Sequence, residues 1–332
     1  MPMLFRSTYV LVLSLLLLPA LASAQDDDPG FAARLTQKFL DSDIDFQRAR
    51  SNVPFLPLAT LTARHYGNTE VELSSGFELE YDLSTISQYA VLPILISQRD
   101  ALFVGEYLSY SDFKVDAPGV EDFDVGTVGL PVGWLHQATP DWQLGGFVMP
   151  LAHRSSLEGS DWNMQYMGGA FGRYIQADNL WWLYGIYADY SPDDDFVIPY
   201  VGASWSINER WTLSAVLPWP AILYSPDGNW VYRFGLSPSG ASWNISTSDG
   251  DVGVNYDAWD LGFTVERRIA GNIFLGARAG TGGLRGVRFD GSGFDAPDFD
   301  VGSSAFFGID LSFRPGFGGE GPPVPGMPGG GF

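Results

Sequence analysis

Apolar and polar residues alternate along much of the chain, most clearly near its C-terminal end in residues 305–317, "AFFGIDLSFRPGF". Small or polar residues separate the apolar ones there. Successive side chains of a β-strand point to opposite sides of the sheet, so this period of two predicts a strand with one apolar and one polar face. The apolar residues are Phe307, Ile309, Leu311 and Phe313.

Similar segments recur from about residue 56 to residue 314, and we expect each to form one strand. Many exceed the five or six residues that are typical of soluble sheets, and most reach the roughly nine to eleven residues that cross a membrane at a tilt. The predicted strands are 70–82, 85–97, 101–115, 121–138, 141–154, 160–176, 180–191, 195–207, 210–218, 229–236, 240–248, 252–269, 272–286 and 299–314, with a separate short strand at 56–66 as an option.

The connections alternate between short turns and longer links. This alternation is typical of a barrel whose two ends differ, whereas a sandwich has no reason to keep it. The short turns are 97–101, 138–141, 176–179, 207–210 and 269–272, and the longer links are 115–123, 154–160, 191–195, 218–229 and 289–300.

The face of each strand opposite the apolar one carries glycine, hydroxyl groups and charge. These residues do not fill a dry core, and an unpaired charge buried in a sandwich would cost several kcal/mol. The pattern therefore predicts a transmembrane barrel, with the apolar faces toward lipid and the charged faces toward a wet lumen. A soluble secreted sandwich is the alternative, and it would be released without detergent. The lumen-lining candidates are Asp189, Glu266, Arg268, Arg278 and Asp310.

Aromatic residues gather where the predicted strands end. Indole and phenol rings favour the boundary between hydrocarbon and water, so two belts of them are expected on a membrane barrel. Trp142, Trp181, Trp182, Trp211 and Phe274 follow short turns, and Tyr110 and Tyr190 lie at the opposite strand ends.

Residues 1–24 have the layout of a secretory signal peptide: Arg6, an apolar run, and the sequence Ala22-Ser23-Ala24 before the expected cleavage point. The chain has no cysteine, so an exported protein of this sequence relies on burial and strand pairing. Charged residues make up 17% of the chain, against roughly 25% in typical soluble domains, while aromatic residues reach 15%.

The two flanks of the predicted barrel differ from it in character. Residues 25–55 read as a periplasmic leader, with a short amphipathic helix over 31–40 that either plugs the lumen or hangs in the periplasm, the second being favoured. Residues 315–332 are rich in glycine and proline and are predicted to be disordered.

The signal peptide, the closing strand that ends "LSF" at Phe313 and the hairpin rhythm together resemble Gram-negative outer-membrane β-barrel proteins over about residues 56–314. The segment "LPWPAILYSPDGNWVYRFG" resembles part of an uncharacterised family of such barrels. The resemblance implies the outer membrane as location, and lipid, lipopolysaccharide and the barrel-assembly machinery as partners. Those barrels usually end on an aromatic residue, whereas here a Gly-Pro tail follows Phe313.

The formal net charge of −21 argues against nucleic-acid binding, which needs a basic surface. The acidic segments 193–195 and 289–300 are read as solvated loops, because neither has the ligand spacing of a known calcium site. His65 and His136 lack nearby ligand partners, so no metal and no cofactor are predicted.

One weak catalytic candidate is the segment "AHRSSLEG" with His153, Ser155 and Glu158. On a strand His153 and Ser155 point the same way, which would let the imidazole act as base for the hydroxyl. The pair resembles the His-x-Ser of outer-membrane lipid A deacylases, and its face was expected to look toward lipid at the rim. The alternative is a polar strand end that runs into a loop.

Together these features predict a single-domain, all-β, antiparallel transmembrane barrel of about 14 strands (12–16), with short periplasmic turns and longer extracellular loops. The leading hypothesis is a porin-like channel that passively transports a small solute through a narrow, polar lumen. A closed structural or surface barrel is the alternative, and a lipid A or phospholipid hydrolase at the rim is the third reading. We do not predict an enzyme.

Overall fold

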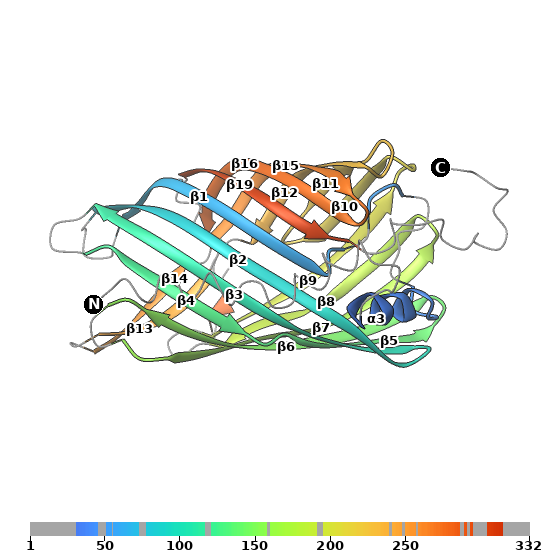
Figure 1. The fold of residues 1–332 in the computed structure, drawn as a ribbon, viewed down its shortest axis with the longest axis horizontal. Coiled ribbons are helices and arrows are strands. Elements are labelled where there is room, and N and C mark those ends of the chain that lie inside the picture. The colour runs from blue at the N-terminus through green and yellow to red at the C-terminus, as the bar shows by residue number, and fades with distance from the viewer. Residues whose placement is uncertain are drawn as a thin grey trace.

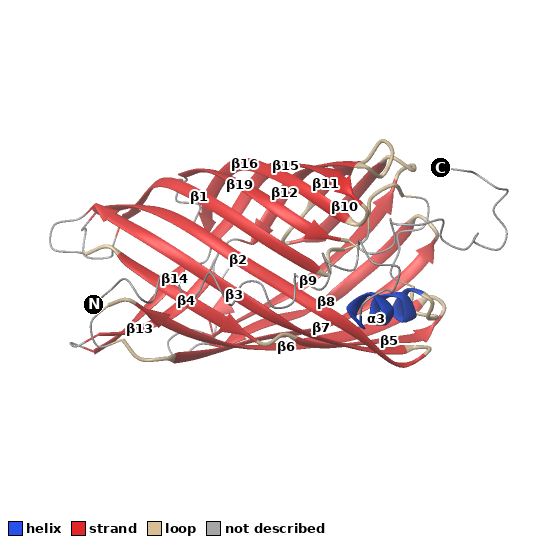
Figure 2. Cartoon of the chain, in the orientation of Figure 1, coloured by secondary structure: helices blue, strands red, loops and turns tan. Residues whose placement is uncertain are grey.

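The strands of the computed structural model close into one antiparallel barrel with a helix at one end (Figures 1 and 2). No described helix is long and apolar enough to cross a membrane. The structure describes residues 31–45, 51–54, 56–72, 78–116, 121–157, 160–190, 195–238, 241–247, 250–256, 258–285, 289–290, 293–294 and 304–314. The helix is α3 (Phe31–Leu40), and the strands are β1 (Ala59–Glu72), β2 (Glu78–Ser97), β3 (Asp100–Asp116), β4 (Phe123–Gly129), β5 (Val132–Thr139), β6 (Trp142–Ser155), β7 (Asn163–Ala177), β8 (Leu180–Tyr190), β9 (Asp195–Ser206), β10 (Trp211–Leu217), β11 (Ala221–Tyr224), β12 (Trp230–Pro238), β13 (Ala241–Thr247), β14 (Gly250–Tyr256), β15 (Ala258–Ala270), β16 (Ile273–Arg285), β17 (Phe289–Asp290), β18 (Gly293–Phe294) and β19 (Ser304–Phe313).

The barrel has 14 strand positions, which confirms the predicted fold class. β4 and β5 share one position, because both pair with β3 on one side and with β6 on the other, and only Leu130 and Pro131 separate them. The ring closes through β1, which pairs with β2 and with the last strand, β19. β13–β14 and β17–β18 are separate hairpins outside this ring.

Several of the predicted strand assignments were wrong in detail, and the predicted strand 252–269 is divided between β14, outside the barrel, and β15. The segments predicted as strands 70–82 and 85–97 are the end of β1 and the single long strand β2, and the optional strand at 56–66 is the start of β1. The predicted strand 240–248 is β13, which lies outside the barrel. The predicted link 218–229 contains β11, which pairs with β10 and β12 and so supplies the fourteenth position.

The wall is short at β10 and β11. β9 pairs with β10 only from Val201 onward, so the first half of β9 has a ladder partner on one side, in β8. Pro199 lies in that half and pairs only with Ile186 of β8. Proline lacks the N–H that a second neighbour would bond, so an edge segment accommodates it.

Large apolar side chains dominate the exposed outer surface of the barrel, as the alternation predicted. Phe307 and Ile309 are 61% and 58% exposed, while Asp310, the residue after Ile309, is 6% exposed. A belt of aromatic rings surrounds the end with the short turns, with the rings of Trp142 and Tyr174 5.0 Å apart and those of Trp211 and Tyr224 4.6 Å apart. Such a surface suits the boundary of a hydrocarbon layer.

Two members of the predicted belt were assigned to the wrong face. Trp181 is buried inside the barrel, where the guanidinium of Arg173 lies 4.3 Å from its ring centroid. Phe274 is fully buried and also points inward, next to Arg314. Both residues follow short turns, but their positions in the two-residue repeat place them on the lumen side.

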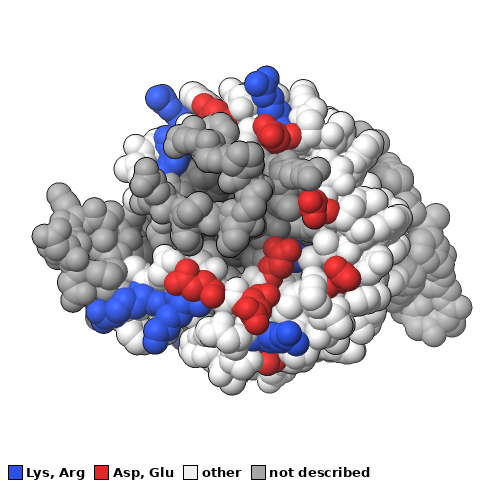
Figure 3. Space-filling model, turned by 90° about the vertical axis from the view of Figure 1, so that its right-hand side faces the viewer, with Lys and Arg blue, Asp and Glu red and all other residues white. Residues whose placement is uncertain are grey.

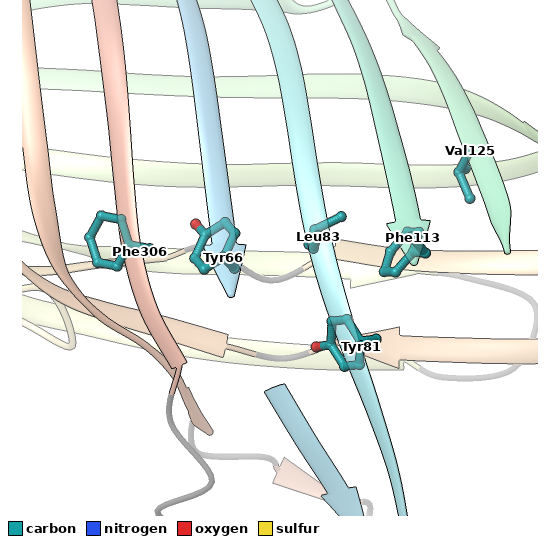
Figure 4. Close-up of a cluster of buried hydrophobic side chains, with 6 residues drawn as sticks. All are labelled: Tyr66, Tyr81, Leu83, Phe113, Val125 and Phe306. Carbon is teal, nitrogen blue, oxygen red and sulfur yellow. The ribbon is translucent and has the colours of Figure 1, made fainter. Parts of the chain in front are cut away.

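A cluster of apolar side chains fills part of the lumen toward the end with the longer loops (Figure 4). It is built by residues of five neighbouring strands, from β19 through β1, β2 and β3 to β4, and its rings approach one another to 5.5–5.8 Å. The cluster narrows the lumen on this side. Its members are Tyr66, Tyr81, Leu83, Phe113, Val125 and Phe306.

Helix α3 lies inside the other end of the barrel (Figure 1). Phe39 is 1% exposed and its ring stands edge-on to that of Phe103 of β3, 5.4 Å away. It packs with inward-facing apolar residues of β2, β3 and β5. The favoured picture of a leader that hangs free of the barrel therefore does not describe residues 31–45, because their apolar face is covered by the barrel wall.

Candidate functional site: the charged lumen

All five predicted lumen residues lie on the inner side of the wall. Asp189 and Asp310 are each 6% exposed, and Glu266 and Arg278 also point inward from β15 and β16. Arg268 shares this face, but its Nε donates a 2.5 Å hydrogen bond to the carbonyl of Gly271 in the adjacent turn, so it lies near the end of the barrel. The inward alternation of small and charged residues thus builds a polar wall.

The centre of this wall is an ion pair between neighbouring strands. Arg278 of β16 approaches one carboxylate oxygen of Asp310 of β19 through Nε and a terminal nitrogen, both at 2.7 Å. The other oxygen accepts a 2.8 Å hydrogen bond from the hydroxyl of Thr62 in β1. Both carboxylate oxygens therefore have partners, which offsets the cost of removing the charges from bulk water.

A second charged group, which the sequence reasoning did not single out, joins β1 to β15. A terminal nitrogen of Arg64 lies 3.6 Å from Asp260, which is 1% exposed. The Tyr66 hydroxyl donates a 2.8 Å hydrogen bond to the same carboxylate oxygen. The alternation of Thr62, Arg64 and Tyr66 in "TLTARHY" would have predicted that these three side chains face inward, but this segment was treated as an optional strand.

Two further arginines complete this side of the lumen. A terminal nitrogen of Arg314, the residue after β19, lies 2.6 Å from an oxygen of Glu266. Arg233 of β12 donates a 2.5 Å hydrogen bond to the carbonyl of Leu236. The alternation of Val231, Arg233 and Gly235 with outward-facing aromatic residues would have identified Arg233 as an inward residue.

On the opposite side of the ring of strands, a chain of hydrogen bonds runs along the wall. Gln165 donates a 2.6 Å hydrogen bond to Asp189, and its amide oxygen lies 2.7 Å from Nε2 of His153. Nδ1 of His153 lies 2.9 Å from the hydroxyl of Thr127. These buried polar groups have partners in one another and form a second polar surface of the lumen.

The predicted pair of His153 and Ser155 is not assembled as a base and a nucleophile. Both ring nitrogens of His153 are engaged by Thr127 and Gln165, and the Ser155 hydroxyl donates a 3.0 Å hydrogen bond to Ser160. The pair also faces the lumen and is buried, so the expected orientation toward lipid was wrong. Glu158 lies outside the described residues.

The leader crosses the barrel end on this side and binds the wall through polar contacts. The side-chain amide of Gln143 donates a 2.9 Å hydrogen bond to the carbonyl of Asp45, and Arg173 donates to the same carbonyl. The backbone N–H of Asn52 donates a 2.7 Å hydrogen bond to the carbonyl of Glu209, in the turn between β9 and β10. Figure 3 looks onto this end, where basic side chains lie toward the rim and acidic ones lie both at the rim and nearer the middle.

Within the described ranges, no group of three His, Asp or Glu residues is arranged to hold a metal ion. Most of the acidic segments 193–195 and 289–300 lies outside those ranges.

No protein-family profile and no curated protein matches the chain. Solved structures with a similar fold include the P. putida toluene transporter TodX, at 11% identity over 77% of this chain and 90% of that chain, with a TM-score of 0.43. An outer membrane channel from Pseudomonas putida F1 is 10% identical over 79% of this chain and 97% of that chain (TM-score 0.41), and a Pseudomonas aeruginosa FadL homologue is 10% identical over 82% and 96% (TM-score 0.40). The resemblance to one uncharacterised family stays a prediction.

Proposed function

We propose that this protein is an outer-membrane channel that passively transports a small polar solute through a narrow lumen. The observation that carries the proposal is the contrast between the two faces of one closed wall. The outside is apolar with an aromatic belt, and the inside carries Arg64, Asp260, Arg278 and Asp310. A closed barrel leaves no unpaired sheet edge in lipid, and charges on its inner face need water or a polar solute beside them.

The lumen is restricted at two levels, which favours slow and selective passage over a wide pore. The apolar cluster around Tyr66 and Phe306 narrows it toward the longer loops, and α3 occupies the end with the short turns. A closed structural barrel is the competing function, and it would require these restrictions to be permanent.

The expected location is the outer membrane of a Gram-negative cell, with the short turns in the periplasm. The outer belt would contact lipid and lipopolysaccharide, and the barrel-assembly machinery would insert the chain.

Single-channel recording of the detergent-folded protein in a planar bilayer tests the proposal. We expect discrete conductance steps, and we expect Glu266→Gln to shift the reversal potential toward anions because it leaves Arg314 without its carboxylate partner. Glu80→Gln is the matched control, since Glu80 is exposed on the outer side of β2. A protein that inserts in the bilayer and never conducts would refute the channel and favour the closed barrel.

A further inference from the structure

Three arginines lie in one row across the inner wall. The strand pairing places Arg233 of β12 opposite Thr264, Thr264 opposite Arg278, and Arg278 opposite Gly308. Gly308 in turn pairs with Arg64 of β1. We call Arg233, Arg278 and Arg64 the arginine row. Paired strands are about 4.8 Å apart, so successive arginines of the row are separated by about 10 Å along a wall that curves around the lumen.

The residues between the arginines are small and leave space for the arginine side chains. Thr264 and Gly308 alternate with the three guanidinium side chains, and a Cβ on Gly308 would lie 3.0 Å from Cγ of Arg64 and 3.2 Å from Cγ of Arg278. The stems of both arginines therefore pass close over Gly308. The row spans five neighbouring strands of the inner wall.

Two members of the row already have carboxylate partners, and a third carboxylate nearby is bound by an arginine outside the row. Asp310 pairs with Arg278, and Asp260 lies within ion-pair distance of Arg64. Glu266 pairs with Arg314, which is outside the row.

Arg233 is the member whose charge is not matched. In the part of the chain that the structure describes, its guanidinium bonds only the carbonyl of Leu236, and no carboxylate lies within ion-pair distance of it. It is close enough to Arg278 and Glu266 to interact with them electrostatically. A half-buried guanidinium beside a second one is stabilised by an anion, because the lumen screens charge less than bulk water does.

We infer that Arg233 and Arg278 form a binding site for a small oxyanion in the lumen, and that this site makes the channel prefer anionic solutes. Guanidinium groups present planar pairs of N–H donors that match the oxygens of phosphate and carboxylate groups. Arg233 supplies the free donors, and Arg278 and Arg64 extend the positive surface along the wall. The inference rests on the proposed channel for its selectivity, but anion binding itself does not require conduction.

The first test is binding, with inorganic phosphate as the probe and the full detergent-folded protein as the sample. A ligand that binds only the folded state raises its melting temperature. We expect phosphate to stabilise the wild-type protein, and Arg233→Gln to weaken phosphate binding about tenfold, equivalent to about 1.4 kcal/mol. Acetate in place of phosphate shows whether the site takes carboxylates as well.

The matched control is Arg267→Gln, which removes the same charge from the outer face of β15, where Arg267 lies 5.1 Å from the ring centroid of Trp230. It should bind phosphate as the wild-type protein does. Arg233→Lys keeps the charge without the planar donor pair and should bind phosphate more weakly than the wild type but more tightly than Arg233→Gln, which separates a loss of charge from a loss of folding. Equal phosphate responses in Arg233→Gln and the wild type, or no response in either, would overturn the site.

The second test is the reversal potential in a salt gradient. We expect a preference for anions in the wild type and in Arg267→Gln that falls in Arg233→Gln, and partial block of the current by phosphate. A conducting wild type with no dependence on Arg233 would refute the selectivity while leaving the channel intact. Phosphate binding through Arg233 in a protein that never conducts would keep the site and refute the channel.

Discussion

Gly308 is a residue whose missing side chain shapes the lumen. A Cβ at this position would lie 2.8 Å from the backbone carbonyl oxygen of Ala63, in addition to its contacts with the stems of Arg64 and Arg278. The carbonyl belongs to the paired strand and does not move without breaking the ladder. Gly308 is thus required by close approach and not by an unusual backbone conformation.

We expect Gly308→Ala to destabilise the barrel by about 1–3 kcal/mol, the usual cost of overpacking. The change is measured as a shift in the temperature at which the detergent-folded protein no longer migrates as a compact species on a gel. Gly133→Ala is the control, because its Cβ would meet no heavy atom closer than 3.5 Å and should leave this temperature unchanged. Equal temperatures for both variants would show that the wall gives way easily at Gly308.

At the scale of residues, the two-residue repeat shows which side chains of a strand share a face, because the period is fixed by the backbone. The repeat does not by itself decide which face is the inner one: Asp189 and Asp310 are buried on the inner side, but so are His153 and Ser155, which were expected to face lipid. It did not identify hydrogen-bond partners, which come from other strands. For His153 the partners are Thr127, 26 residues earlier, and Gln165, 12 residues later, and Ser155 is not among them.

Among the elements, α3 is the one whose position bears most on function. Its sequence shows an apolar stripe with Leu35, Phe39 and Leu40, which predicts that one face is covered. The stripe does not say what covers it, since a barrel interior and any other apolar surface give the same pattern. The structure supplies the answer through Phe103, Leu135 and the other inward residues around Phe39.

We expect Phe39→Ala to loosen α3 and to raise either the frequency or the size of the conductance steps. Truncating a buried phenylalanine costs about 3–5 kcal/mol of packing, and this loss would fall on the contact between the helix and the wall. Single-channel recording measures the effect. Phe31→Ala is the matched control, because Phe31 belongs to the same helix but is 67% exposed. Identical recordings for the two variants would mean that α3 does not restrict the lumen.

Strand boundaries were the least predictable feature at this scale. Residues 82–85 read as a turn between two strands, yet β2 runs through them without a bulge in its pairing with β3. The polar residues there, including Asp82 and Ser84, lie on the outer side of the strand beyond the apolar belt, where water replaces lipid. A strand that extends past the membrane loses the alternation on which the prediction depended.

For the whole molecule, the predicted number of barrel strands was right, although one predicted strand lies outside the ring and one strand that was not predicted lies in it. The predicted strand 240–248 forms the separate hairpin with β14, and β11 takes its place in the ring. β11 has only four residues, "AILY", too few for the alternation to stand out from the surrounding prolines. The number of positions is constrained by closure, which no single segment reveals.

The last prediction follows from the orientation of the barrel wall, whose apolar side faces outward. Ile309 lies in the middle of β19, pairs with Ala63 and Ala277, and is 58% exposed. If this surface faces lipid, Ile309→Lys should destabilise the folded barrel by about 2–4 kcal/mol in a bilayer, because a charge at the middle of the membrane is poorly solvated.

Chemical unfolding from lipid vesicles, followed by tryptophan fluorescence, measures this cost. Ala305→Lys is the control, since Ala305 is also exposed on the outer side of β19 but lies close to the strand end, where the cost falls to about 0–1 kcal/mol. A barrel whose outer face lay in water would tolerate both lysines equally, since each would point into solvent. A cost confined to Ile309→Lys therefore distinguishes a barrel that spans a membrane from one that does not.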